Sequence, residues 1–157
     1  MAMNSYLKAL GIGMVAGSRS MTAPALLSAH LAGRAPDALE GTLLSPFTSS
    51  WATMLARVAA VGEMVADKTP NIPPRTEALP LMGRLTVGAF SGFVLCMAER
   101  ESALLGALFG AIGALVGTFG FYHLRRLIGE ETSIPDFAIA VAEDAVAVGG
   151  GLAVLEG

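Results

Sequence analysis

The chain has 157 residues, enough for one domain. Hydrophobic residues make up 54% of it and charged residues only 15%, whereas charged residues make up about 25% of a typical soluble domain. This composition, with a mean hydropathy of +0.62, argues against a soluble protein. The net charge of -3 argues against a nucleic-acid partner, because nucleic-acid binding depends on the neutralisation of phosphates.

Five apolar segments are predicted along the chain. The first is broken, because the motif GSRSMTAPA at residues 17–25 separates residues 6–17 from residues 23–32. The other four segments are at residues 51–66, 79–98, 103–122 and 134–155. The uncharged stretch 103–122 has about the length that crosses a hydrocarbon core of about 30 Å. Because backbone in lipid must form its hydrogen bonds internally and strand-like alternation is absent, we expect one all-α integral membrane domain over residues 1–157, with about five transmembrane helices.

Positive charges in the connecting loops predict the orientation. Five of them fall on one side, namely Lys8, Lys68, Arg75, Arg125 and Arg126, and two fall on the other side, namely Arg34 and Arg100. Lysine and arginine concentrate on the cytoplasmic side, which places the N-terminus and the proline-rich loop, residues 67–78, in the cytoplasm. Five crossings then place the C-terminus outside, whereas a hairpin in the broken first segment would move the N-terminus across.

A weak internal similarity suggests a repeat. Residues 9–20 and 110–126 both contain small residues at helical spacing ahead of an arginine, and each stretch precedes an apolar segment with two acidic residues. If the first two segments correspond to the last two, the single segment between them makes the copies inverted. Inverted repeats with broken helices are typical of transporters, although shared composition is an alternative explanation.

Glycines recur every three or four residues in the fourth segment, at Gly106, Gly110, Gly113, Gly117 and Gly120. This spacing places them on one helical face, a glycine zipper that lets another backbone approach closely. We expect the face to pack inside the bundle, and a homo-oligomer interface is the alternative.

Two adjacent acids lie near the middle of the fifth segment, Glu143 and Asp144. An ionisable group at membrane depth costs at least about 2.5–3.5 kcal/mol on insertion scales, so such groups are usually paired, face the bundle interior and serve a function. Adjacent residues on a helix point about 100° apart. We therefore expect one acid to face inward, the other to meet a neighbouring helix, and neither to face lipid.

A second pair of acids, Glu63 and Asp67, is four residues apart and hence on one helical face near the end of the second segment. Lys68 follows directly, and Arg57 and Arg84 are candidate counter-charges. These charges either neutralise one another across helix contacts or form a proton or cation relay or an anion site.

The motif in the first segment predicts a helix break with a binding role. Thr22 or Ser20 is suited to cap a new half-helix that has Pro24 in its first turn. The free N–H groups at that helix start, with Arg19 beside them, would form an anion site at membrane depth.

The alternative role for this motif is structural. Its polar groups would satisfy only one another, or Arg19 would pair with Glu63 or Glu143. A single polar centre requires these acids within about 6 Å of Arg19, the range in which opposite charges strongly affect each other.

Metal and cofactor chemistry is not indicated. His30, His123 and the single cysteine, Cys96, share no ligand spacing typical of a zinc site. We expect no metal and no cofactor.

Three stretches together carry a family resemblance, namely GSRSMTAPA, GEMVADKTPNIPPRT and PDFAIAVAEDAVAVGGG. The chain resembles the small bacterial integral membrane proteins of the domain of unknown function 4126 family over most of its length. The resemblance implies a helical multi-pass protein of the bacterial inner membrane, and it implies no activity.

A second resemblance is local. GSRSMT is similar to a loop of undecaprenyl pyrophosphate phosphatase, a membrane enzyme that also uses acids four residues apart. The resemblance implies that Arg19 and Ser20 hold a lipid phosphate while Glu63 and Asp67 support hydrolysis. The loop here is one residue shorter, Ala16 stands where that family has proline, and the chain is far shorter.

The sequence thus favours a non-enzymatic membrane protein that binds or transports a small ion or anionic solute. The candidate residues for binding or ion coupling are Arg19, Ser20, Thr22, Glu63, Asp67, Lys68, Arg84, Glu143 and Asp144. Two alternatives stand beside this hypothesis, a lipid-phosphate phosphatase and a non-catalytic subunit of a larger membrane complex. The expected partners are membrane lipids, the bound solute, and further copies of the chain or other subunits.

Overall fold

A computed structural model describes residues 3–71 and 74–157 of the chain. Ile72 and Pro73 of the predicted proline-rich loop lie outside the described residues. The regular elements of the described part are all helical, which confirms the predicted all-α class: α1 (Ser5–Ser18), α2 (Thr22–Arg34), the short 3-10 helix η1 (Ser45–Thr48), α3 (Ser50–Ala66), α4 (Ala78–Ala98), α5 (Ala103–Glu131) and α6 (Asp136–Glu156).

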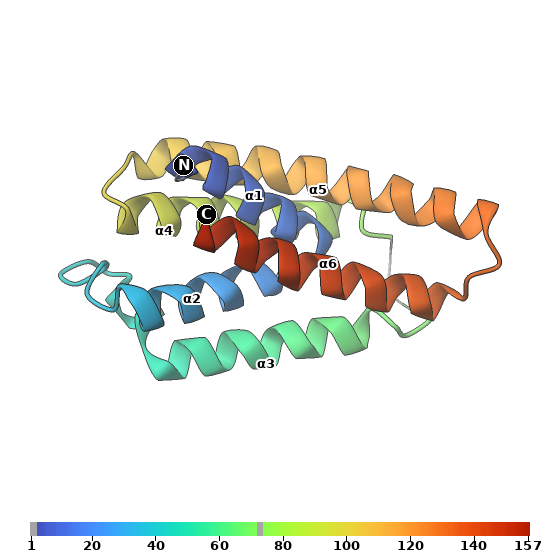
Figure 1. The fold of residues 1–157 in the computed structure, drawn as a ribbon, viewed down its shortest axis with the longest axis horizontal. Coiled ribbons are helices and arrows are strands. Elements are labelled where there is room, and N and C mark those ends of the chain that lie inside the picture. Colours follow the sequence, from blue (N-terminus) through green and yellow to red (C-terminus); the bar gives the residue numbers. More distant parts are fainter. Residues whose placement is uncertain (1–2, 72–73) are drawn as a thin grey trace.

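The broken first segment forms a helical hairpin, with α1 and α2 running in opposite directions (Figure 1). Both ends of the hairpin lie beside the end of α6, since the backbone N–H of Met3 donates to the carbonyl of Gly157 at 2.9 Å and Arg34 lies 3.8 Å from Glu156. The turn, residues 19–21, lies at the opposite end of α1. The predicted single crossing of this segment is therefore wrong, and so is the predicted separation of the two chain ends.

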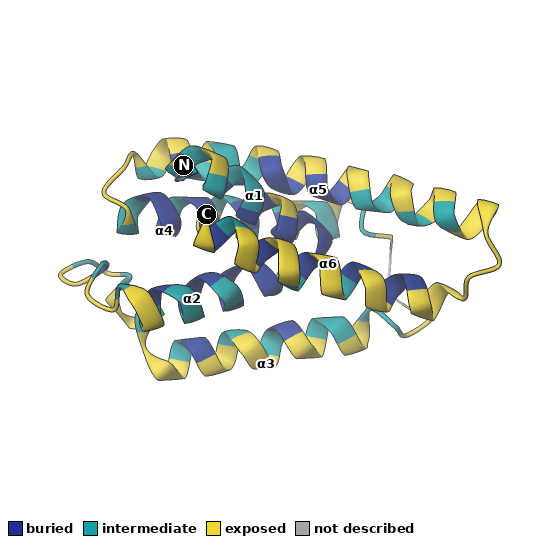
Figure 2. Ribbon diagram, viewed as in Figure 1, coloured by how far each residue is buried: buried dark blue, intermediate teal, exposed yellow. Residues whose placement is uncertain are grey.

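Close backbone contacts hold α1 against α5 and α5 against α4. A Cβ atom added to Gly110 would collide with the backbone of Gly88, and one added to Gly113 would collide with the backbone of Leu10. Gly106, Gly110, Gly113 and Gly117 of α5 thus pack inside the bundle, whereas Gly120, which was predicted on the same face, is exposed. Figure 2 shows the buried residues concentrated where these helices meet, whereas α3 is largely exposed.

Membrane crossing is supported for three of the described helices. By length and composition, α4, α5 and α6 are long and apolar enough to span a membrane. The remaining helices are shorter, with 14 residues in α1, 13 in α2 and 17 in α3. Large apolar side chains such as Leu55, Val58 and Phe137 are more than half exposed, as expected for a surface that lipid covers. Five crossings are not supported.

The fourth segment continues beyond its predicted end. α5 runs to Glu131, beyond the end of the predicted segment 103–122. The extension is stabilised by its own side chains, since Arg126 Nε donates to Glu130 at 2.8 Å and pairs four residues apart support a helix. α5 is continuous where the first segment turns back, so the inverted repeat is not supported either.

The charge bias behind the predicted orientation is smaller in the structure. Lys8 lies 3.3 Å from Glu99, which places it at the same end of the bundle as Arg34 and Arg100. The bias of five to two therefore becomes four to three. This margin is too small to orient the protein by the positive-inside rule.

Candidate functional site

Charged side chains from six parts of the chain come together near the turn of the hairpin. We call this set the polar centre, and its members come from the turn, the end of α3, the loop that follows it, and helices α4, α5 and α6: Arg19, Ser20, Glu63, Asp67, Lys68, Arg75, Arg84, Arg125, Asp136, Glu143 and Asp144. It contains five basic and five acidic residues, so its formal charge is zero. Tertiary folding thus joins the two acid pairs that the sequence placed on separate segments.

Arg19 binds one acid from each pair. Its side chain is fully buried, forms an ion pair with Asp67, and places Nε 2.6 Å from Oδ1 of Asp144. The approach to Asp144 lacks hydrogen-bond geometry, so charge pairing holds it, and Lys68 Nζ donates to the other oxygen of Asp144 at 2.7 Å. The partners of Arg19 are therefore Asp67 and Asp144, and the expected pairing with Glu63 or Glu143 is wrong.

Glu63 instead caps the start of α2. Its carboxylate accepts hydrogen bonds from the backbone N–H and hydroxyl of Ser20, at 2.9 and 2.6 Å, and from the N–H of Met21 at 2.7 Å. The predicted caps from Thr22 or Ser20 are wrong, since α2 has no side-chain cap of its own. Pro24 does lie in the first turn of α2. A carboxylate from α3 therefore occupies the anion site predicted at this helix start.

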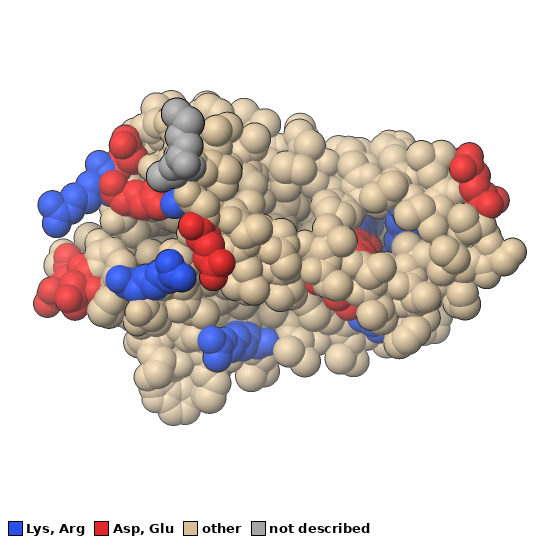
Figure 3. All heavy atoms as spheres, viewed as in Figure 1, with Lys and Arg blue, Asp and Glu red and all other residues tan. Residues whose placement is uncertain are grey.

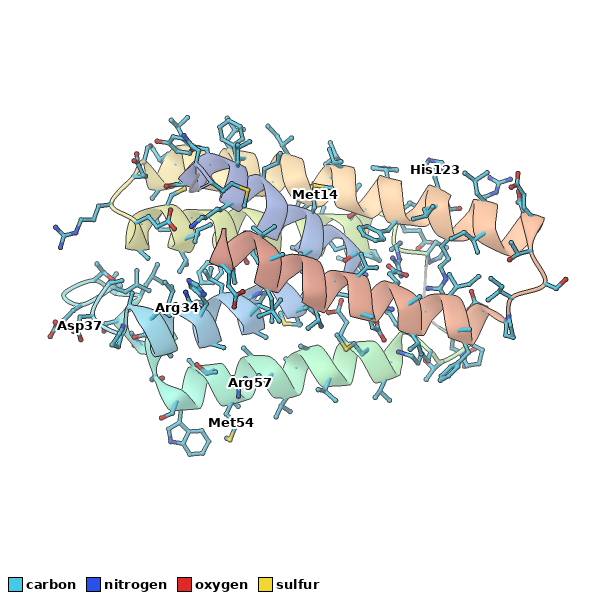
Figure 4. All side chains as sticks on the ribbon, in the orientation of Figure 1. Met14, Arg34, Asp37, Met54, Arg57 and His123 are labelled. Carbon is cyan, nitrogen blue, oxygen red and sulfur yellow. The ribbon has the colours of Figure 1, made fainter. Side chains whose placement is uncertain are left out.

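Arg84 satisfies the other side of the break. Its Nη1 donates to the carbonyls of Gly17 and Ser18, both at 2.8 Å, and these carbonyls at the end of α1 lack helical partners. Its Nη2 lies 3.8 Å from Glu63. One acid and one base thus compensate the opposite dipoles of the two helix ends. The other candidate counter-charge, Arg57, lies on the outer side of α3, away from the polar centre (Figure 4).

Glu143 faces a different set of cations. It forms an ion pair with Arg75, and its carboxylate lies 3.5 Å from Arg125. Arg125 also donates two hydrogen bonds to Asp136, at 3.0 and 2.7 Å, and Arg75 lies 3.7 Å from Asp67. In the sequence, Arg75 and Arg125 indicate only the orientation, and Asp136 is not among the predicted site residues. A long-range pairing of this kind leaves no pattern in the local sequence.

The ion pairs form one continuous chain of alternating charge. In order, it runs Lys68, Asp144, Arg19, Asp67, Arg75, Glu143, Arg125 and Asp136. Burying a charge carries a large desolvation cost that a close opposite charge offsets. Each inner member has two partners, which explains how so many charges remain between apolar helices.

A cavity of about 340 Å³ lies beside the polar centre. Three arginines and two aspartates line it, with the side chains of Thr69 and Tyr122: Arg75, Arg84, Arg125, Asp67 and Asp136. The charged lining therefore carries a formal charge of +1. Figure 3 shows charged side chains inside a hollowed part of the surface, toward the end where α5 and α6 are joined. Arg19 is fully buried and does not line the cavity.

The histidines lie apart from this site. His123 is on the outer face of α5 (Figure 4), and His30 is in α2. Among residues 3–71 and 74–157, no group of three or more His, Cys, Asp or Glu side chains is arranged to hold a metal ion.

No family model matches the chain, and no curated protein or solved structure is significantly similar to it. The two resemblances noted in the sequence therefore stay predictions. The function has to be argued from the geometry of the polar centre and its cavity.

Proposed function

We propose that this is an integral membrane protein that binds a small anionic solute in the cavity beside the polar centre. The observation that carries the proposal is the cavity lining, in which Arg75, Arg84 and Arg125 face one space with a formal charge of +1. Arginine presents several N–H donors in a planar fork that suits carboxylate and phosphate oxygens. A cavity between helices with a few convergent polar groups is a common form of ligand site.

An anion suits this cavity better than a cation. Both lining aspartates already have arginine partners, because Asp67 pairs with Arg19 and Asp136 with Arg125. A cation would have to compete with those arginines for each carboxylate. An anion would instead add an acceptor for arginine N–H groups at a positively charged lining, and the hydroxyl of Tyr122 could donate to it.

The proposal extends to location and transport. We place the protein in the bacterial inner membrane as a multi-pass protein, with the base of the α1–α2 hairpin and the end of α6 on one side. Helix ends that meet at a charged site within the bundle recur in transporters, and here the end of α1 and the start of α2 meet at the polar centre. Release of the anion would then accompany a rearrangement of the ion-pair chain, in which the carboxylates take the place of the anion beside the arginines.

Binding and flux measurements test this proposal. Titration of the purified protein with phosphate, sulfate or chloride in detergent should give saturable binding, and Arg125→Gln should weaken it by about 10- to 100-fold, the loss of one charge-assisted hydrogen bond. Arg126→Gln is the matched control, because Arg126 is the next residue, is 61% exposed in its side chain and pairs only with Glu130 among the described residues. Equal binding by both variants, or no anion binding by the wild type, would overturn the proposal. Anion flux in proteoliposomes separates a transporter from a binding protein.

A second candidate function is a lipid-phosphate phosphatase. It is favoured by the contacts of GSRS with the acids four residues apart, since Ser20 binds Glu63 and Arg19 binds Asp67. Arg19 has no exposed surface, so a phosphate would have to displace its carboxylate partners. Release of phosphate from a prenyl pyrophosphate in detergent, lost in Arg19→Ala but not in Arg57→Ala, would establish this function in place of simple binding.

A further inference from the structure

α5 and α6 leave an apolar groove between them. Each helix presents residues at helical spacing to the other, Phe121, Leu124 and Ile128 on α5 and Ile139, Ala142 and Val146 on α6. These side chains do not interdigitate, because α6 packs mainly against the α1–α2 hairpin. They border a groove of about 170 Å³ whose surface is almost entirely apolar.

A second apolar groove continues the first. It lies between α1 and α6, also has a volume of about 170 Å³, and shares Phe121 and Val146 with the first groove. It extends along α6 to Val154. From Glu143 to Val154 the path is about 16 Å at a rise of 1.5 Å per residue, which is close to half of a hydrocarbon core of about 30 Å. The joined grooves thus match the depth of one membrane leaflet.

The grooves meet the polar cavity at Arg125. This arginine lines both the α5–α6 groove and the cavity of about 340 Å³. Glu143 also lines the groove, while Asp136 lines the cavity, and Arg125 contacts both acids. An apolar groove that suits a hydrocarbon chain therefore adjoins a positively charged cavity at Arg125. The groove and the cavity match the apolar and the anionic halves of an amphiphile.

We propose that the anion bound by this protein is the phosphate headgroup of a membrane lipid, and that one apolar chain of that lipid lies in the two grooves along α6. The inference rests on the proposed anion binding, because the headgroup occupies the same cavity. Arg125 binds the phosphate through charge-assisted hydrogen bonds. The chain covers the apolar side chains on α5 and α6 and extends toward Val154. A free phosphate ion shares the headgroup chemistry but leaves the grooves unused.

The experiment compares a lipid phosphate with free phosphate. Delipidated protein in detergent is titrated with oleoyl lysophosphatidic acid, with oleoyl lysophosphatidylcholine, and with inorganic phosphate, and binding is followed by native mass spectrometry. Val146→Phe fills the groove without changing charge. Val141→Phe is its matched control, because Val141 is exposed on the same helix and does not line either groove.

We expect lysophosphatidic acid to bind at least about tenfold more tightly than either of the other two probes, a difference of about 1.4 kcal/mol. Val146→Phe should weaken this binding about tenfold and leave inorganic phosphate unaffected, whereas Val141→Phe should change neither. Arg125→Gln should weaken the binding of both lysophosphatidic acid and inorganic phosphate.

Two results would overturn the inference. If inorganic phosphate binds the wild type as tightly as lysophosphatidic acid, and Val146→Phe changes neither, the lipid is excluded while anion binding stands. If the wild type binds neither lysophosphatidic acid nor inorganic phosphate, the proposed function fails as well. Size-exclusion profiles of the variants confirm that each is folded.

Discussion

Arg19 is paired with two acids from different parts of the chain. The side chain is fully buried, and its two partners, Asp67 and Asp144, come from different helices. Adjacent residues on α6 point in different directions, so Asp144 reaches Arg19 while Glu143 reaches Arg75 and Arg125. Glu143 is almost fully buried and the side chain of Asp144 is 16% exposed, as expected for acids that face protein rather than lipid.

Removal of the arginine should be strongly destabilising. Arg19→Met leaves Asp67 and Asp144 with less compensation, and breaking a buried ion pair by removing one partner costs about 3–5 kcal/mol. The melting temperature in detergent should fall markedly. Arg57→Met removes the same charge from the exposed side of α3 and should change stability by no more than about 0.5 kcal/mol. Equal melting temperatures for the two variants would contradict the role assigned to Arg19.

The α1–α2 hairpin combines two kinds of stabilisation. Its turn is held by charged side chains from α3 and α4, with Glu63 at the start of α2 and Arg84 at the end of α1. Along its length, α1 packs against the glycine face of α5, so that Ala9, Ile12 and Ala16 are fully buried. The hairpin is thus the central element, although its helices, with 14 and 13 residues, are shorter than the roughly 20 residues that cross a hydrocarbon core.

Glycine substitutions on α5 should separate packing from helix propensity. At Gly110 an added Cβ meets the backbone of Gly88, whereas at Gly120 it meets nothing within 4 Å. Gly110→Ala should therefore destabilise the protein by about 1–3 kcal/mol through overpacking. Gly120→Ala should instead stabilise it by up to about 1 kcal/mol, the difference in helix propensity. Melting temperatures in detergent measure both effects, and a loss of stability at Gly120 alone would contradict the packing described for α5.

At the scale of the whole molecule, the hairpin decides the topology. Its two ends and the turn between α4 and α5 lie at one end of the bundle, while the loop between α3 and α4 lies toward the other end (Figure 1). The charged cavity opens near that second end, where Thr69 and Asp136 line it. Loop charges alone did not reveal this arrangement.

Cysteine labelling tests this topology. Cys96 is the single cysteine, so a Cys96→Ala background allows one new site at a time. A membrane-impermeant maleimide should label Asn4→Cys and Asp37→Cys, which lie before α1 and after α2, from the same side of the membrane and Glu77→Cys from the opposite side; all three native residues are exposed. Labelling of the first two positions from opposite sides would show that the hairpin is a single crossing.

Local sequence predicted most of the helices and part of the polar centre, whereas Arg75, Arg125 and Asp136 were not predicted. Predicted segments 79–98 and 103–122 start within one residue of α4 and α5, because long apolar runs identify helices in lipid. The break at residues 19–21 was also found, since polar residues interrupt an apolar run. The partners of Arg19 were wrong, because two acids on one helix differ only in direction, and tertiary packing selects between them.

By itself, the sequence determined that the chain is helical and suited to a membrane, and that its buried charges must find one another. Composition and the spacing of apolar residues are sufficient for this, because lipid leaves exposed backbone and charge no other partner. Only the tertiary structure decided that the first segment turns back, that Glu63 caps α2, and that Arg75, Arg84 and Arg125 share a cavity. These features depend on contacts between residues more than forty positions apart in the chain, which no local pattern encodes.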